Sequence, residues 1–140
     1  MPNAKRIQSQ WIGQYLAAAE LTRRDYDVSF DEDTKSTVLH VESSEGTSFK
    51  VECKNTIKLG DSWLVKRRVK PSEDYFFIFV YGSKEEPYDT PQFWITSSEK
   101  VAELYDVYIK NNPGGNDLNI RPNNLEKPGG WEILPDYPKT

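Results

Sequence analysis

Glu52 and Lys54 are the residues of this chain whose types and spacing could do chemistry. They stand two positions apart in the run Val51-Glu52-Cys53-Lys54, whose apolar and β-branched neighbours predict a strand. Because side chains alternate along a strand, the carboxylate and the ammonium point to the same face. Such a pair is unusual on a strand that the pattern predicts to be largely buried, so it is the first candidate for a functional site.

A predicted hairpin determines which residue faces this pair. A preceding strand over Val38–Glu42 runs into Ser43-Ser44-Glu45-Gly46, which is typical of a turn. A turn centred on Glu45 or Gly46 brings Val38 opposite Glu52 or Lys54. A metal-dependent nuclease would need an acid at that place, and this chain has a valine.

The elements that position the hairpin follow from hydrophobic periodicity. Apolar residues at helical spacing predict an amphipathic helix over about 9–24, and Thr96-Ser97-Ser98-Glu99 predicts the start of a second helix. Strands are expected at 28–30, 38–43, 48–54, 75–81 and 93–95, of which 75–81 is apolar on both faces and should be central. Residues 111–140 are rich in Gly, Pro and Asn and predict an irregular segment held by Trp131, Ile133 and Leu134.

Length and composition bound the possible functions. The chain has 140 residues, which predicts one domain over 1–140 with a core at about 9–109. A net charge of −4 argues against a protein that binds nucleic acid over its whole surface. One cysteine excludes an internal disulfide and a multi-cysteine zinc site, which favours a cytoplasmic location. Residues 1–10 lack a signal-peptide core, and no run approaches the ~18 apolar residues of a membrane span, so no membrane is expected.

Four segments, in this order, resemble the PD-(D/E)xK nuclease superfamily. They are the helix end Ala-Glu-Leu-Thr-Arg-Arg over 19–24, the hairpin over 38–54 with its Glu52-x-Lys54, the segment 62–68, and the strand 75–80. The likeness is to small bacterial members and covers about residues 9–109. It implies a restriction-endonuclease-like α/β core, with a central mixed sheet of about five strands flanked by helices.

The resemblance also implies a site. In active members an acid on the first helix, an acid on the hairpin and the E-x-K pair come together, the strand carboxylates hold Mg²⁺, and the lysine positions or activates water. Glu52 and Lys54 match this motif as catalytic residues, with Glu52 also a metal ligand. The missing acids fall on Gln14 in the helix and Val38 in the hairpin. The resemblance therefore implies a degenerate metal site.

Two other groups of residues are candidates to supply the missing metal ligands. Asp31 and Asp33 lie in the loop upstream of the hairpin, and either could supply a metal ligand. His40 is expected on the same strand face as Val38, but two residues along a strand are ~6.8 Å apart, too far without a backbone movement. The plainer interpretations are a solvated turn at residues 31–33, a structural His40, and a half-exposed ion pair between Glu52 and Lys54.

A basic segment follows the E-x-K motif. Between residues 50 and 70, seven Lys and Arg stand against two acids, a local net charge of +5. Such an excess could follow a phosphate backbone, with an aromatic face for stacking. The candidate nucleic-acid-binding residues are Lys58, Trp63, Lys66, Arg67, Arg68 and Lys70. The alternative is a charged loop that only keeps the surface solvated.

Three functions remain open from the sequence. The leading hypothesis is a nuclease-like domain with an impaired metal site, which binds DNA, other nucleic acid or a protein partner with little or no cleavage. The second is a Mg²⁺-dependent DNA endonuclease that takes its acids from Asp31 or Asp33. The third is a protein-interaction domain without a nucleic-acid role, which the acidic total charge favours.

Overall fold

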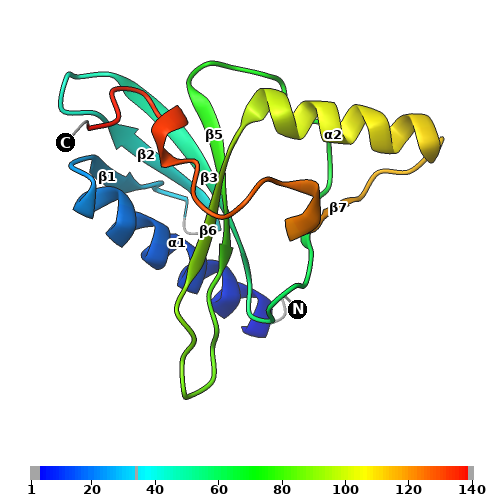
Figure 1. Ribbon diagram of the computed structural model, residues 1–140, viewed down its shortest axis with the longest axis horizontal. Coiled ribbons are helices and arrows are strands. Elements are labelled where there is room, and N and C mark those ends of the chain that lie inside the picture. Colours follow the sequence, from blue (N-terminus) through cyan, green and yellow to red (C-terminus); the bar gives the residue numbers. More distant parts are fainter. Residues whose placement is uncertain (1–3, 34, 139–140) are drawn as a thin grey trace.

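The chain folds around one mixed β-sheet with a helix on each face. The computed structural model of the protein describes residues 4–33 and 35–138 (Figure 1). The helices are α1 (Ala4–Arg23) and α2 (Ser98–Asn111). The strands are β1 (Asp27–Phe30), β2 (Val38–Glu42), β3 (Ser48–Thr56), β4 (Trp63–Val65), β5 (Tyr75–Tyr81), β6 (Gln92–Ser97) and β7 (Leu118–Ile120), with short 3-10 helices at Pro122–Asn124 and Trp131–Ile133.

The main sheet has the strand order β1-β2-β3-β5-β6. The first three strands form an antiparallel meander, β3 and β5 are parallel, and β6 returns antiparallel to β5. The predicted α/β class, with a mixed five-stranded sheet and two helices, is confirmed. The two-stranded sheet of β4 and β7 was not predicted, because each strand has only three residues.

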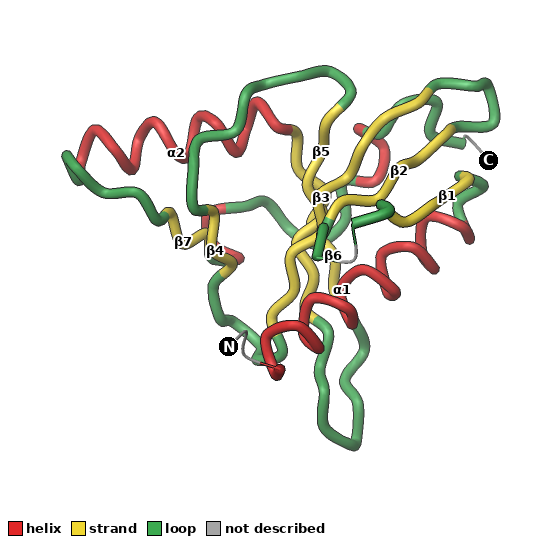
Figure 2. The backbone as a smooth tube through the Cα atoms, turned by 180° about the vertical axis from the view of Figure 1, so that it is seen from behind, coloured by secondary structure: helices red, strands yellow, loops and turns green. Residues whose placement is uncertain are grey.

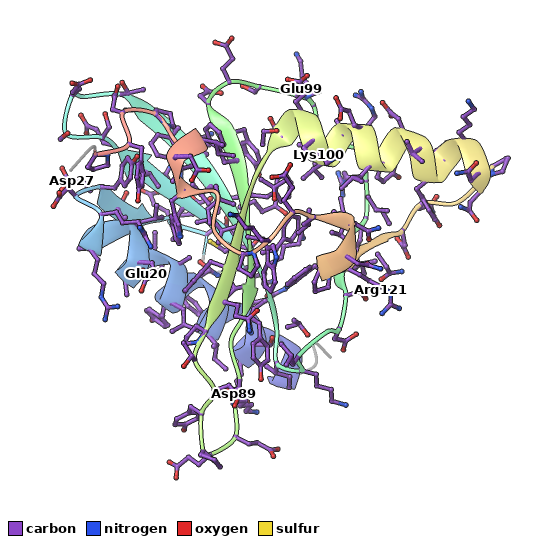
Figure 3. The ribbon with its side chains drawn as sticks, viewed as in Figure 1. Glu20, Asp27, Asp89, Glu99, Lys100 and Arg121 are labelled. Atoms are coloured by element: carbon purple, nitrogen blue, oxygen red, sulfur yellow. The ribbon has the colours of Figure 1, made fainter. Side chains whose placement is uncertain are left out.

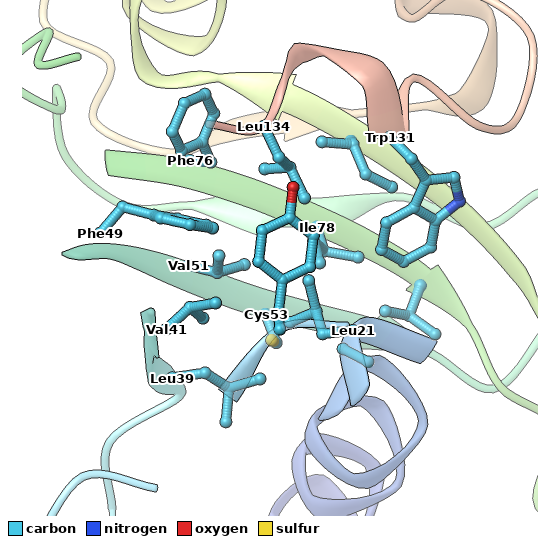
Figure 4. Close-up of a cluster of buried hydrophobic side chains, with 14 residues drawn as sticks. Leu21, Leu39, Val41, Phe49, Val51, Cys53, Phe76, Ile78, Trp131 and Leu134 are labelled. Atoms are coloured by element: carbon cyan, nitrogen blue, oxygen red, sulfur yellow. The ribbon is translucent and has the colours of Figure 1, made fainter. Parts of the chain in front are cut away.

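The side chains of β3 and β5 divide the core into two layers. On the face that α1 covers, Val51, Cys53 and Ile78 pack with Ala17 and Leu21 of the helix (Figure 4). On the other face, a second cluster gathers under α2, β4 and β7; its members include Trp63, Phe77, Phe79, Tyr105 and Ile120. Since β5 is buried on both sides, the prediction of a central strand is confirmed.

The C-terminal segment is part of the core. Trp131 and Leu134 are buried in the cluster on the α1 side, and the Arg24 guanidinium lies 4.2 Å from the Trp131 ring centroid. Gly129 pairs beside β6, because its N–H donates to the Phe93 carbonyl and its carbonyl accepts from the Ile95 N–H. Buried residues therefore continue past residue 109, the predicted end of the core. Among the described residues, no helix combines the length and apolar character that a membrane crossing requires.

Candidate functional site

The hairpin of β2 and β3 has one of the two registers that the sequence predicted. Val38 is the cross-strand partner of Glu52, and Leu39 is the partner of Val51. The turn closes with a hydrogen bond from Ser43 N–H to the Thr47 carbonyl at 2.8 Å. Gly46 in this turn has φ +85°, a conformation that glycine adopts without strain. The residue that faces Glu52, at the position where the resemblance implies an acid, is therefore a valine.

Both carboxylate oxygens of Glu52 already have partners. The Tyr75 hydroxyl donates to Oε1 at 2.7 Å, and Lys54 Nζ lies 3.1 Å from Oε2. The Glu52 and Lys54 side chains are 21% and 25% exposed, so the pair is accessible but largely shielded from solvent. Burial of its ring, followed by the hydrogen bond to Glu52, raises the pKa of Tyr75. Tyr75 therefore remains a neutral donor that holds the carboxylate in place.

Tyr75 is the site residue that sequence reasoning missed. It is the first residue of β5, and it reaches Glu52 because β5 runs parallel to β3 with Glu52 next to Phe77. Parallel pairing between strands separated by a long connection is not visible in local sequence patterns. The one available signal was the alternation of Tyr75 with Phe77 and Phe79, which places the three rings on one face.

The cleft beside this pair contains one carboxylate among its described lining residues. Its walls are the β3 face, β4 and the segment after β4. We call it the Glu52 cleft; it is lined by Glu52, Lys54, Leu64, Val65, Lys66, Arg67 and Val69. A magnesium ion prefers several oxygen ligands. Here the lining carboxylate is engaged by a hydroxyl and an ammonium. The residues present do not fit the metal ion that the resemblance implies.

The structure places Gln14 on the wrong side of the sheet for this site. Gln14 is 3% exposed and lies on the inner face of α1, in the row that also buries Ala17 and Leu21. That helix covers the β3 face to which Val51 and Cys53 point, whereas Glu52 and Val38 point to the opposite face. The interpretation of Gln14 and Val38 as two missing acids of one site is therefore wrong for Gln14.

Asp31 and Asp33 have partners of their own. Asp31 Oδ1 lies 3.9 Å from His40 Nε2, and a hydrogen bond from Ser36 lowers the pKa of Asp31. Asp33 Oδ1 accepts the backbone N–H of Lys35 at 2.9 Å. In the described part of the chain, no three His, Cys, Asp or Glu side chains are grouped to hold a metal ion. Neither aspartate lines the Glu52 cleft.

The basic segment divides into three environments. Lys66 and Arg67 are exposed and line the Glu52 cleft, while Lys58 and Lys70 are exposed outside it. Arg68 forms a bidentate pair with Asp106 of α2, with distances of 2.8 and 3.2 Å. The ion pair lowers the pKa of the Asp106 carboxyl, and the carboxylate balances the positive charge of Arg68.

Trp63 is not a stacking surface. It is 2% exposed, its ring packs against Phe79 and Trp94, and its indole N–H donates to the Val80 carbonyl at 3.0 Å. The prediction that it binds a base is wrong because β4 pairs with β7 and turns the indole into the core. The position of β7 in the chain, far from β4, explains why the sequence did not reveal this burial.

Comparisons of the chain with protein-family models, with curated proteins and with solved structures found no significant match. The resemblance to PD-(D/E)xK nucleases therefore rests on the four sequence segments alone. A function is therefore inferred from the contacts of the Glu52 cleft.

Proposed function

We propose that this protein is a nuclease-like domain with a degenerate E-x-K site, which binds nucleic acid through the Glu52 cleft without cleaving it. The observation that carries the proposal is the charge of the cleft. Lys54, Lys66 and Arg67 line it together, against Glu52 as the one acid among the described lining residues. Lys66 and Arg67 form no ion pair with a described carboxylate, so their charges are available to phosphates.

The contacts of Glu52 support the absence of cleavage. Metal-dependent phosphodiester hydrolysis needs oxygen ligands that remain free to hold the ion and neutralise the scissile phosphate. Tyr75 and Lys54 take both oxygens of Glu52, and Val38 supplies no second carboxylate. The same cleft can still bind a phosphate backbone, because such binding requires cationic side chains and does not require a metal ion.

The proposal is tested by the fluorescence anisotropy of labelled single-stranded and duplex DNA across a series of salt concentrations. Binding should weaken steeply with salt, and Lys66→Glu with Arg67→Glu should remove about two units of the salt slope. Lys110→Glu with Lys127→Glu is the matched control, because both lysines are exposed and neither lines the cleft. No binding at low salt, or an equal loss in the control variant, would contradict the proposal.

Incubation with Mg²⁺ separates this function from an endonuclease. The wild-type protein should leave plasmid and oligonucleotide DNA intact. Cleavage that depends on Mg²⁺ and disappears in Glu52→Ala and Lys54→Ala would replace the proposal with the enzyme, with ligands drawn from elsewhere.

A further inference from the structure

One edge of the main sheet is open. Among the described strands, β1 is outermost and pairs only with β2, and Figure 2 shows it at the rim of the sheet with α1 running beside it. The other edge, β6, is covered because Gly129 exchanges backbone hydrogen bonds with Phe93 and Ile95 at 2.7 and 2.9 Å. For residues 27–30 the described chain shows no backbone partner beyond β2. The outward backbone groups of β1 are therefore free to pair with another strand.

An aromatic cluster lies beside this edge on the α1 face. Phe30 of β1 lies across from the core residue Leu39, and its ring packs against Tyr15 at 5.4 Å and Trp11 at 6.4 Å between centroids. Tyr15 is 59% exposed and Phe30 is 40% exposed. An added strand would place every second side chain against these rings and cover them.

The opposite face of the same edge is acidic. Asp27 and Ser29 alternate with Val28 and Phe30, so they point away from α1, and Figure 3 shows Asp27 at the outside of the molecule. Asp31 continues this face, as its proximity to His40 shows. Residues 25–33 carry five carboxylates and no basic side chain. A second copy of β1 would bring five more carboxylates to this edge, so charge argues against a homodimer here.

We propose that the β1 edge is a docking site for an extended segment of a partner protein, whose side chains alternate between apolar and basic. The backbone of that segment would extend the main sheet beyond β1, which is the β-augmentation mode of peptide recognition. Its apolar side chains would cover Tyr15 and Phe30, and its basic side chains would face Asp27 and Asp31. This site is separate from the Glu52 cleft and does not depend on nucleic-acid binding.

The test uses a short synthetic peptide that alternates lysine with leucine. Isothermal titration calorimetry should detect its binding, and hydrogen exchange should show new protection at the amides of Val28 to Phe30. Two control peptides keep the composition: one groups the lysines apart from the leucines, and one has every backbone amide N-methylated. Both should bind much more weakly, because the first loses the alternation and the second cannot donate backbone hydrogen bonds.

Variants of the protein test the same surface independently of the peptide variants. Asp27→Lys should lower the affinity for the peptide by about two- to fivefold, which is the range for an exposed charge pair. Asp117→Lys is the control, because Asp117 is exposed in the loop before β7. Phe30→Ser should also weaken binding, and circular dichroism should show that the variant remains folded.

Three results would overturn the proposal. They are equal binding of the N-methylated peptide, equal binding by Asp27→Lys and wild type, and a concentration-dependent dimer whose formation protects the β1 amides. The last result would assign the edge to a second copy of the chain.

Discussion

Tyr75 and Glu52 lie on parallel neighbouring strands, and the 2.7 Å hydrogen bond between them fixes the carboxylate of the E-x-K pair. Tyr75→Phe should lower the free energy of unfolding by about 1.5–3 kcal/mol at neutral pH, because the bond has a charged acceptor. Chemical denaturation measures this loss. Tyr88→Phe should have no effect, since Tyr88 is 65% exposed.

The same tyrosine makes stability depend on alkaline pH. Its pKa in the folded state is raised by burial and by Glu52, so the unfolded chain loses this proton first, at about pH 10. The stabilisation is fully present below that pH and is lost as pH rises further. The difference in stability between wild type and Tyr75→Phe should therefore shrink as the pH is raised from about 9 to about 11. A constant difference across this range would contradict the assignment.

Val38→Asp should create a divalent-metal site. The new carboxylate faces Glu52 across the hairpin, and the repulsion between the two is relieved when a cation binds. In the absence of metal the variant should be less stable, and Mn²⁺ should raise its melting temperature. Val38→Asn introduces a side chain with the shape of aspartate but without its charge, and this variant should show no response to the metal. A response of the wild type equal to that of Val38→Asp would contradict the impaired site.

Gln14→Glu should not contribute to such a site. The new carboxyl would be buried between α1 and the sheet, on the face opposite to Glu52. We expect a loss of about 2–4 kcal/mol near neutral pH that becomes smaller at about pH 4, because burial raises the pKa of a carboxyl and the neutral form costs less. Thermal unfolding at both pH values, with and without Mn²⁺, measures this. Stabilisation of Gln14→Glu by the metal would show that the helix does reach the cleft.

The sequence was sufficient for the features that depend on local periodicity. Alternation in 38–54 and the turn residues around Gly46 predicted the hairpin, with Val38 opposite Glu52 or Lys54, and the structure has Glu52 at that place. The apolar run 75–81 predicted the central strand. The errors concern contacts between distant segments. The burial of Trp63 depends on β7, and the side of the sheet that α1 covers decides the place of Gln14.

The turn of the β2–β3 hairpin offers an acid-sensitive contact for a last prediction. Asp136, in the C-terminal segment, accepts hydrogen bonds from Ser43 Oγ and Thr47 Oγ1, each at 2.6 Å. These two bonds, with a smaller effect of Glu45, lower the pKa of Asp136 below its ordinary value of 3.8. The stabilisation by this carboxylate is therefore present above about pH 4 and is lost as pH falls through the folded-state pKa.

Asp136→Asn should remove this dependence while keeping the backbone, because asparagine tolerates the φ of +52° at this position. The comparison is best made with Glu45→Gln present in both proteins. The hydrogen bond to Asp136 raises the pKa of Glu45, so protonation of Glu45 would otherwise stabilise the same contact at low pH. In that background, the difference between the two unfolding free energies isolates the effect of the Asp136 charge. This difference should be largest near neutral pH and should vanish well below about pH 4, where the carboxyl is protonated. A difference that persists there would show that the contact does not depend on the charge of Asp136.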